Sequence, residues 1–149
     1  MKLVLGKLVS TFAIAATALT LATIGTASVA TVAQADSCWL HNGSLMRLRA
    51  NGNWRAFYYE NPRNVLRAAG VRRGTLLFEG EKRGNTYVGT ARRFSKFCPG
   101  SPLIYNVRGP VAPSQTRVTV SGSRQVHNRC QATGRTAWDD LVFTYSHRC

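Results

Sequence analysis

The amino-acid sequence predicts a mainly β domain: a small antiparallel β-barrel or sandwich of about seven strands with one short helix, stabilised by disulfides. Three observations support this fold class. Seven short segments rich in β-branched and aromatic residues follow one another at nearly regular spacing. Glycine, asparagine and proline turn signals separate them. All four cysteines lie in the same part of the chain, and an even cysteine count in an exported chain is typical of disulfides.

The clearest predicted element is a hairpin near the start of this domain. Residues 44–50 alternate between apolar and basic side chains, which indicates a half-buried strand. Asn51 and Gly52 then form a favoured hairpin turn, and the aromatic-rich residues 54–59 form the returning strand. The other predicted strands are residues 75–81, 86–94, 103–107, 116–120 and 141–145.

The connections between the strands carry further signals. Asn61 is suited to cap a short helix that starts with Pro62, and Gly70 is suited to end it after residues 63–69. Gly89 lies inside a predicted strand, where glycine often marks a bulge or a bend.

Three later stretches are predicted to interrupt the strands. Residues 95–102 are expected to be a loop, because they contain two prolines and a glycine. The pairs at residues 109–110 and 112–113 are expected to break the chain, because each ends in proline. Residues 128–139 contain turn residues and are expected to connect the last two strands.

The N-terminal part of the chain has the three features of a secretory signal peptide. Lys2 and Lys7 precede a long uncharged apolar run, and small residues at Ala33 and Ala35 suit signal peptidase. We therefore predict a cleaved signal peptide over residues 1–35.

Cleavage would leave residues 36–149 as a single β-rich domain, in the periplasm or secreted, with no transmembrane span. Two alternatives remain. The apolar run is long enough to be an uncleaved membrane anchor, and Cys38 lies close enough to be a lipid-attachment site. Lipidation would leave an odd number of cysteines in an oxidising compartment, and the residues before Cys38 suit it poorly.

Four cysteines allow three disulfide pairings. We favour Cys38–Cys149, which would tie the two ends of the domain together, and Cys98–Cys130, which would close one long loop. A zinc site is the alternative, since His127 and His147 each lie close to a cysteine. The spacing matches no compact zinc signature, so we expect no metal and no cofactor.

Positive charge is the strongest functional signal. Without Lys2 and Lys7, the 20 basic residues of the chain become 18, and six acids leave a net charge of 18 − 6 = +12. Sixteen of the 18 are arginines, whose planar guanidinium binds phosphate and carboxylate. The alternative is that the arginines reflect only coding bias and a soluble surface.

This charge predicts a non-enzymatic binding or envelope-associated module with an anionic partner. The partner would be lipopolysaccharide, anionic lipid, peptidoglycan or an acidic protein, and nucleic acid is a further candidate. Arginines on or beside the predicted hairpins are the candidate binding residues: Arg47, Arg49, Arg55, Arg92 and Arg93.

An enzyme is not favoured, because the sequence contains no phosphate-binding loop, nucleophile elbow or dinucleotide fingerprint. One alternative is a small secreted hydrolase, for example nuclease-like, that uses His127 or His147 with Glu60 as a carboxylate partner. Another is a secreted enzyme inhibitor, although an inhibitor of a basic lysozyme should be acidic. The acidic pair Asp139 and Asp140 is expected to form a turn or an ion pair with arginine rather than a cation site.

Several short motifs run through most of the domain: HNGS at residues 41–44, PR at 62–63, GTLLF at 74–78, YVGTA at 87–91, and then Cys98. This pattern resembles a group of small exported, periplasmic bacterial proteins. The likeness continues to Cys130, whereas Trp39 and the tail with Cys149 do not match. The resemblance implies an exported envelope protein, assigns no activity or site, and supports Cys98–Cys130 better than Cys38–Cys149.

Overall fold

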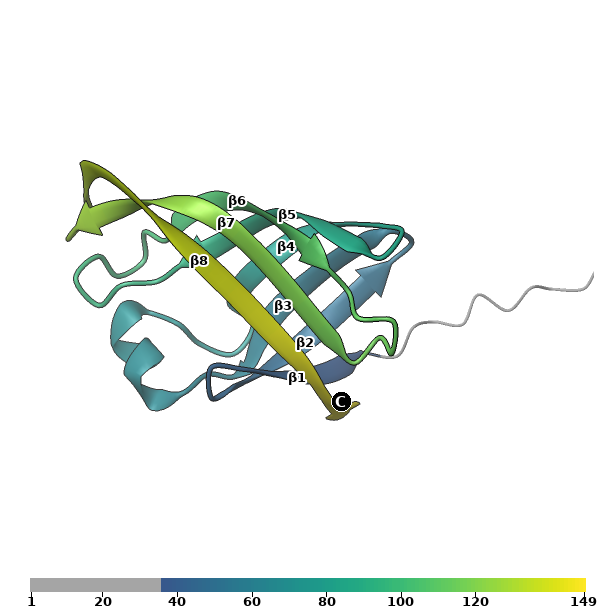
Figure 1. Ribbon diagram of the computed structural model, residues 1–149. Helices are drawn as coiled ribbons and strands as arrows, with labels where there is room; N and C mark the ends of the chain where they lie inside the picture. The colour runs from purple at the N-terminus through teal and green to yellow at the C-terminus, as the bar shows by residue number, and fades with distance from the viewer. Residues whose placement is uncertain (1–35) are drawn as a thin grey trace, which may run out of the picture. The chain divides into compact units, whose positions relative to one another are not determined.

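The computed structural model describes residues 36–149, which form a closed antiparallel barrel of eight strands (Figure 1). The strands follow chain order around the barrel, and β8 pairs with β1 to close it. Their bounds are β1 Ser37–His41, β2 Ser44–Asn51, β3 Trp54–Asn61, β4 Leu76–Arg83, β5 Thr86–Arg93, β6 Leu103–Pro110, β7 Arg117–Asn128 and β8 Gln131–Arg148. The predicted fold class is confirmed, with eight strands in place of about seven. The predicted signal peptide lies outside the described residues.

The additional strand is β1, which is only five residues long. It forms a tight hairpin with β2 through Asn42 and Gly43, both of which have positive φ angles. Its other edge pairs with β8, so this short strand closes the barrel. Five residues beside the end of a long apolar run are too few to show a clear strand period.

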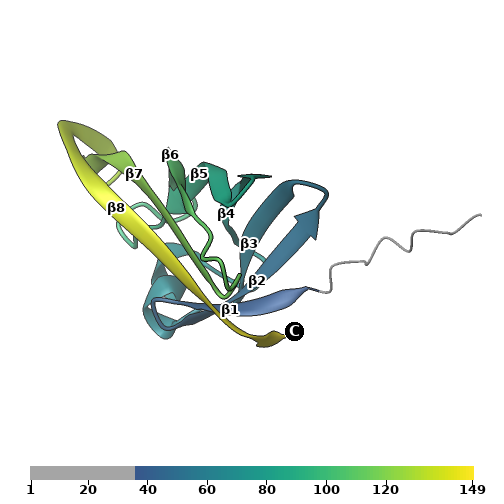
Figure 2. The ribbon, with the colours of Figure 1, turned by 45° about the vertical axis from the view of Figure 1, so that its right-hand side comes forward.

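Strands β7 and β8 are much longer than predicted. They stay paired up to Asn128 and Gln131, and the turn is made by Arg129, with a φ of 55°, and Cys130. The interpretation of residues 128–139 as a connection is therefore wrong, since most of them belong to β8. Side chains on both faces of this part of β8 are largely exposed, so the stretch has no alternating apolar pattern. Figure 2 shows the paired strands extending past their neighbours.

The barrel interior is filled by aromatic and β-branched side chains from successive strands. Phe57, Phe78 and Phe143 are fully buried, and the rings of Phe57 and Phe143 stack with centroids 3.8 Å apart. Valines and a methionine from the other strands complete this layer. The interior of a small eight-stranded barrel is just wide enough to be filled in this way by inward-facing side chains.

Glycine allows neighbouring strands to approach closely. Gly80 and Gly89 face each other in β4 and β5, and the register there is unbroken. A Cβ atom on Gly89 would lie 2.1 Å from the Glu79 carbonyl oxygen, so no other residue fits without displacing the backbone. Gly89 thus marks a close backbone approach rather than a bulge, and such glycines help a sheet to coil into a barrel.

The two ends of the barrel differ in their connections. The end that we call the turn end holds the short β2–β3 and β4–β5 turns, the β6–β7 connection and both ends of the domain. There, Cys38 and Cys149 form a disulfide. The opposite end, which we call the mouth end, holds the β1–β2, β3–β4, β5–β6 and β7–β8 connections. There, Cys98 and Cys130 join the β5–β6 loop to the hairpin tip. Both favoured disulfides are confirmed.

One helical segment lies at the mouth end. It is a 3₁₀ helix over Asn64–Ala69, and Gly70 ends it in the left-handed region with a φ of 85°, as predicted. The predicted cap is wrong, because Asn61 is the last residue of β3 and Arg63 takes the cap position without a side-chain hydrogen bond. Among residues 36–149, no helix has the length and hydropathy to cross a bilayer.

Candidate functional site

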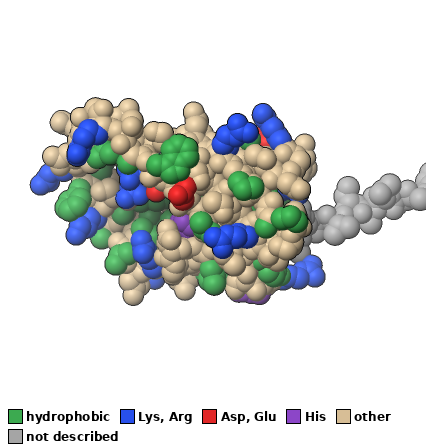
Figure 3. All heavy atoms as spheres, in the orientation of Figure 1, with side chains coloured by type: hydrophobic (Ala, Val, Ile, Leu, Met, Phe, Trp, Pro, Cys, Tyr) green, Lys and Arg blue, Asp and Glu red, His purple; other side chains and the backbone are tan. Residues whose placement is uncertain are grey.

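A polar cavity of about 150 Å³ lies at the mouth end. Figure 3, which views the barrel from its side, shows acidic side chains close to a histidine, with basic side chains around them. The charged and titratable residues that line the cavity are His41, Tyr59, Arg63, Arg92, Arg93, Tyr105, Asp139 and Asp140. They come from β1, β3, β5, β6, β8 and the segment before the 3₁₀ helix, so only the closed barrel brings them together.

The carboxylate of Asp139 is the centre of the polar contacts at this end. Its Oδ2 accepts hydrogen bonds from the Tyr105 hydroxyl at 2.8 Å, Arg124 Nε at 3.2 Å and Arg93 Nη1 at 3.3 Å. Asp139 faces Gly122 across the β7–β8 ladder, on the inward side of the barrel. The expected ion pair between the acidic pair and arginine is therefore present. Two arginines share one carboxylate, which leaves a local excess of positive charge.

Tyr105 stays a hydrogen-bond donor in this cluster. Burial raises the pKa of its hydroxyl, and the hydrogen bond to Asp139 raises that pKa further. The phenol is therefore protonated at neutral pH and satisfies one lone pair of the carboxylate.

His41 lies at the base of the cavity, where it is 8% exposed. Its Nδ1 is 2.9 Å from the Val142 carbonyl oxygen, which assigns the ring proton to Nδ1 and leaves Nε2 as an acceptor. Nε2 has one long contact, 3.4 Å to the side-chain amide of Asn42. Burial lowers the pKa of His41, and the charge of Arg63 lowers it further, so the ring is neutral at pH 7.

Tyr59 and Arg63 supply hydrogen-bond donors whose capacity is unused. Tyr59 is only 4% exposed, yet its hydroxyl has no hydrogen-bond partner among residues 36–149. Burial raises the pKa of Tyr59 to about 12 against the opposing charge of Arg63, so the hydroxyl stays protonated. Arg63 is exposed, and within the described chain its guanidinium makes no hydrogen bond or ion pair.

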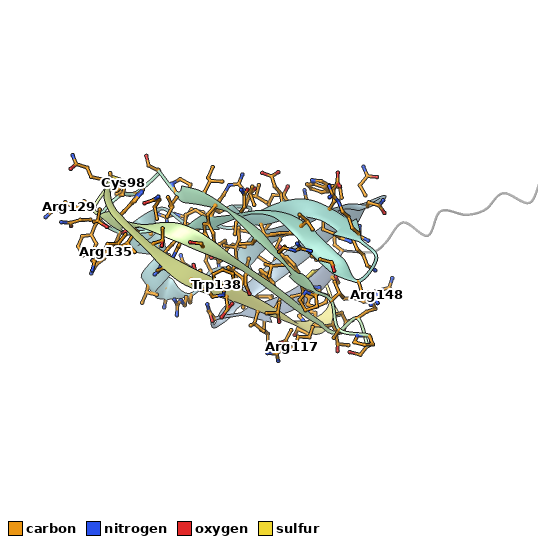
Figure 4. The ribbon with its side chains drawn as sticks, turned by 45° about the horizontal axis from the view of Figure 1, so that its top comes forward. Cys98, Arg117, Arg129, Arg135, Trp138 and Arg148 are labelled. Atoms are coloured by element: carbon orange, nitrogen blue, oxygen red, sulfur yellow. A yellow bond between two sulfur atoms is a disulfide. The ribbon has the colours of Figure 1, made fainter. Side chains whose placement is uncertain are left out.

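A second hollow of about 290 Å³ adjoins the cavity and shares Arg93 and Phe94 with it. Its lining adds Arg124, His127 and Arg129. The Cys98–Cys130 disulfide holds the β5–β6 loop against the hairpin tip beside this hollow. Figure 4 shows Arg129 and Arg135 near Cys98 at this tip, whereas Arg117 and Arg148 lie at the opposite end.

The structure divides the five arginines predicted as binding residues among three places. Arg93 belongs to the mouth cluster. Arg92, its neighbour, also lines the mouth cavity, and its Nη2 donates to Glu79 Oε1 at 2.6 Å. The remaining Nη1 of Arg92 is buried and has no partner in the described part of the chain.

Arg47 and Arg49 lie on the outer face of β2, away from the mouth cavity. Arg47 forms ion pairs with Asp36 at 3.0 Å and Glu60 at 2.8 Å. Arg49 stacks over Tyr58, with its guanidinium carbon 5.3 Å from the ring centroid. Arg47, Arg49 and Tyr58 line a separate hollow. The carboxylates of Asp36 and Glu60 offset much of the arginine charge there.

Arg55 is buried at the turn end and is 7% exposed. Its Nη1 donates to the carbonyl oxygens of Gly52 at 2.7 Å and Trp54 at 2.8 Å. Arg55 faces inward like Phe57 and closes this end of the barrel, so the structure does not bring it together with the other four arginines.

The predicted hydrolase residues are not assembled. His127 lies beside the second hollow, whereas His147 lies near the end of β8, opposite Cys38. Glu60 lies with Arg47 and Arg73 at a third place. Within residues 36–149, the His127 ring makes no hydrogen bond. The geometry offers no acid–base pair to these histidines.

Sequence reasoning did not select Tyr59, Arg63, Tyr105 or Arg124 as functional residues. For Tyr59 the sequence does carry one signal. Tyr59 lies two residues after Phe57 in the same strand, so the two side chains must face the same way, inward. The convergence of the four residues depends on pairings between distant strands, which no local pattern shows.

All four cysteine sulfurs are bonded in disulfides. No group of three or more His, Cys, Asp or Glu residues in the described domain is placed to hold a metal ion. Comparison with protein-family models, with curated proteins and with solved structures found no match to this chain. The resemblance to small exported bacterial proteins therefore stays a prediction.

Proposed function

We propose that this protein is an exported, non-enzymatic binding module that holds an anionic partner at the mouth end of its barrel. One observation carries the proposal. Cationic side chains converge on two adjoining cavities, and one carboxylate, Asp139, accepts hydrogen bonds from two of them. An anion is the natural ligand for such a surface, because it offsets the remaining charge and accepts from the unused donors.

Export is supported by two features. The sequence begins with the pattern of a secretory signal, and the domain contains two disulfides, which persist in oxidising compartments. In the periplasm or outside the cell, the partner would be an envelope component with phosphate or carboxylate groups: lipopolysaccharide, anionic lipid or peptidoglycan. An acidic protein has the same surface chemistry and is the other partner class.

The test is co-sedimentation of the exported protein with purified peptidoglycan and with anionic lipid vesicles, at low and high salt. Neutral vesicles are the control. We expect binding to an anionic fraction that decreases steeply as salt rises, because exposed charges are screened. Binding that is unchanged by salt, or equal binding to neutral vesicles, would contradict an electrostatic partner.

Matched variants locate the surface. Arg129→Gln with Arg135→Gln removes two charges at the hairpin tip, and Arg117→Gln with Arg148→Gln removes two at the turn end (Figure 4). The total charge is the same in both double variants. We expect the tip variant to weaken binding and the turn-end variant to have little effect. Equal loss in both would mean that net charge alone, rather than the mouth end, attracts the partner.

A further inference from the structure

We propose that the mouth cavity binds a single phosphate-type oxyanion, with the Tyr59 hydroxyl at its base and the Arg63 and Arg93 guanidiniums at its rim. This inference rests on the proposed function, because it names the chemical group that the basic mouth end would recognise. It concerns the cavity alone and not the surrounding charged surface.

The unused donors are the first argument. Tyr59 lines the cavity and is 4% exposed as a whole residue. Its hydroxyl has no hydrogen-bond partner within residues 36–149. The hydroxyl oxygen itself is not sealed from solvent, so it is open to the cavity and can donate a hydrogen bond to a ligand or a water molecule there. Arg63 lies close enough for its charge to lower the pKa values of both Tyr59 and His41.

The existing carboxylates do not fill this role. Asp139 Oδ2 already accepts from Tyr105, Arg93 and Arg124. Asp140 Oδ1 accepts from the Trp138 indole at 3.0 Å, on the outward face of β8. Arg93 uses Nη1 for Asp139, which leaves its other nitrogens available at the rim, where the side chain is 51% exposed.

Cavity size limits the ligand. A water molecule needs roughly 10–15 Å³ on this scale, whereas drug-sized ligands occupy sites of roughly 300–1,000 Å³. The cavity of about 150 Å³ therefore suits one compact group, with the rest of the ligand outside. The adjoining basic hollow of about 290 Å³ offers that remainder a path across Arg93.

Hydrogen-bond chemistry favours phosphate over carboxylate. The donors come from β3, β5 and the segment before the 3₁₀ helix, and a tetrahedral oxyanion offers acceptor oxygens in more directions than a planar carboxylate. His41 adds Nε2, whose one contact is the long one to the Asn42 amide, so this nitrogen can also accept a hydrogen bond from a ligand hydroxyl. A phosphate monoester has a second pKa near 6, so close to neutral pH part of it carries such a hydroxyl, which a carboxylate lacks.

Calorimetric titration of the exported protein with inorganic phosphate, at constant ionic strength, tests the inference. Acetate is the comparison for carboxylate. The matched control for Arg63→Gln is Arg67→Gln. Arg67 is an exposed arginine of the 3₁₀ helix that follows Arg63, and it does not line the cavity. Tyr59→Phe has a matched control in Tyr58→Phe, on the opposite face of the same strand.

We expect saturable binding of one phosphate, with acetate weaker. Arg63→Gln should weaken phosphate binding about tenfold, because it removes one charge-assisted hydrogen bond. Tyr59→Phe should weaken it several-fold, and neither control should change it. Absence of phosphate binding, or equal effects in a variant and its control, would overturn the inference.

Vesicles separate this inference from the proposed function and identify the source of the phosphate. Co-sedimentation with phosphatidic acid vesicles presents a monoester on a surface, and excess free phosphate serves as the competitor. Competition together with sensitivity to Tyr59→Phe supports a lipid phosphate in the cavity. Salt-sensitive vesicle binding that neither free phosphate nor Tyr59→Phe affects would overturn the inference and leave the proposed function standing. Phosphate binding without binding to any envelope fraction would support the cavity and contradict the envelope partner.

Discussion

The turn end of the barrel is closed by backbone hydrogen bonds and the buried Arg55 side chain, whereas the mouth end has charged side chains around a cavity. At the turn end, Val111 N donates to Asn85 O at 2.8 Å and Cys149 N donates to Asp36 O at 3.1 Å. The mouth end has backbone hydrogen bonds as well, such as Gly74 N to Tyr59 O at 2.7 Å, but there Asp139 also gathers three side-chain donors beside the cavity.

Two arginines illustrate this difference. Arg55 at the turn end donates to two backbone carbonyls and is buried, whereas Arg63 at the mouth end is exposed with its donors unused in the described domain. Backbone closure stabilises a barrel without offering a ligand anything to bind. Side-chain closure leaves donors and space available, and binding residues are often supplied by loops on such a rigid scaffold. On the proposed function, recognition belongs to the mouth end, where side-chain donors and space stay available.

The two disulfides are expected to give the largest effects. Chain-entropy arithmetic gives about 5 kcal/mol for Cys38–Cys149, which spans 111 residues, and about 4 kcal/mol for Cys98–Cys130, which spans 32. We expect paired Cys→Ala variants to lower the free energy of unfolding in that order, measured by denaturant titration. Only loss of Cys98–Cys130 should also weaken anion binding, because it releases the loop beside the second hollow. Weaker binding in the folded Cys38–Cys149 variant would mean that the two ends are not independent.

Replacing Asp139 should separate stability from binding. Asp139→Asn keeps one carbonyl acceptor but leaves Arg93 and Arg124 without a charged partner, so we expect unfolding to become easier by about 1–3 kcal/mol. Anion binding should become tighter, because the variant removes the negative charge that competes with a ligand. Glu60→Gln removes an acid away from the mouth cavity and is the matched control for binding. Weaker anion binding in Asp139→Asn would show that the carboxylate positions the arginines rather than competing for them.

His41 should make stability depend on pH. Its folded-state pKa lies below 6.5 because of burial, so as pH falls below 6.5 the unfolded chain takes up a proton before the folded protein does. We therefore expect the free energy of unfolding to decrease between about pH 7 and pH 5, with a smaller slope in His41→Gln. Denaturant titrations at several pH values measure both slopes. An equal slope in the variant would mean that His41 ionises alike in both states.

Sequence pattern predicted most of the scaffold. Residues 44–50 and 54–59 alternate or carry aromatics, and they became β2 and β3 joined at Asn51 and Gly52. Both cysteine pairings were predicted as well. The strands follow from local pattern, and cysteine count predicts two disulfides, whereas the pairing was favoured because it ties the two ends of the domain together and closes one long loop. The projecting part of β8 was missed, because a strand that is exposed on both faces carries no hydrophobic period.

The mouth cluster was only partly predictable. Arg93 was selected for its charge, and Asp139 was expected to pair with arginine. Tyr59 and Tyr105 were not selected, because an aromatic residue in a strand is more often core than site, and both are indeed buried. Their hydroxyls gain a role only where strands distant in sequence close around a cavity. Closure of this kind depends on register and strand tilt, which the sequence does not display.

The smallest expected effect concerns Arg47, a predicted binding residue that lies away from the mouth. Its ion pairs with Asp36 and Glu60 are partly exposed, so Arg47→Gln should change the free energy of unfolding by less than about 1 kcal/mol. Glu60 would keep its ion pair with Arg73. Binding to anionic vesicles should fall no more than in Arg148→Gln, since each variant removes one charge far from the cavity. A loss larger than that in Arg63→Gln would move the binding surface to the β2–β3 face, and the contrast between the two barrel ends would then concern stability alone.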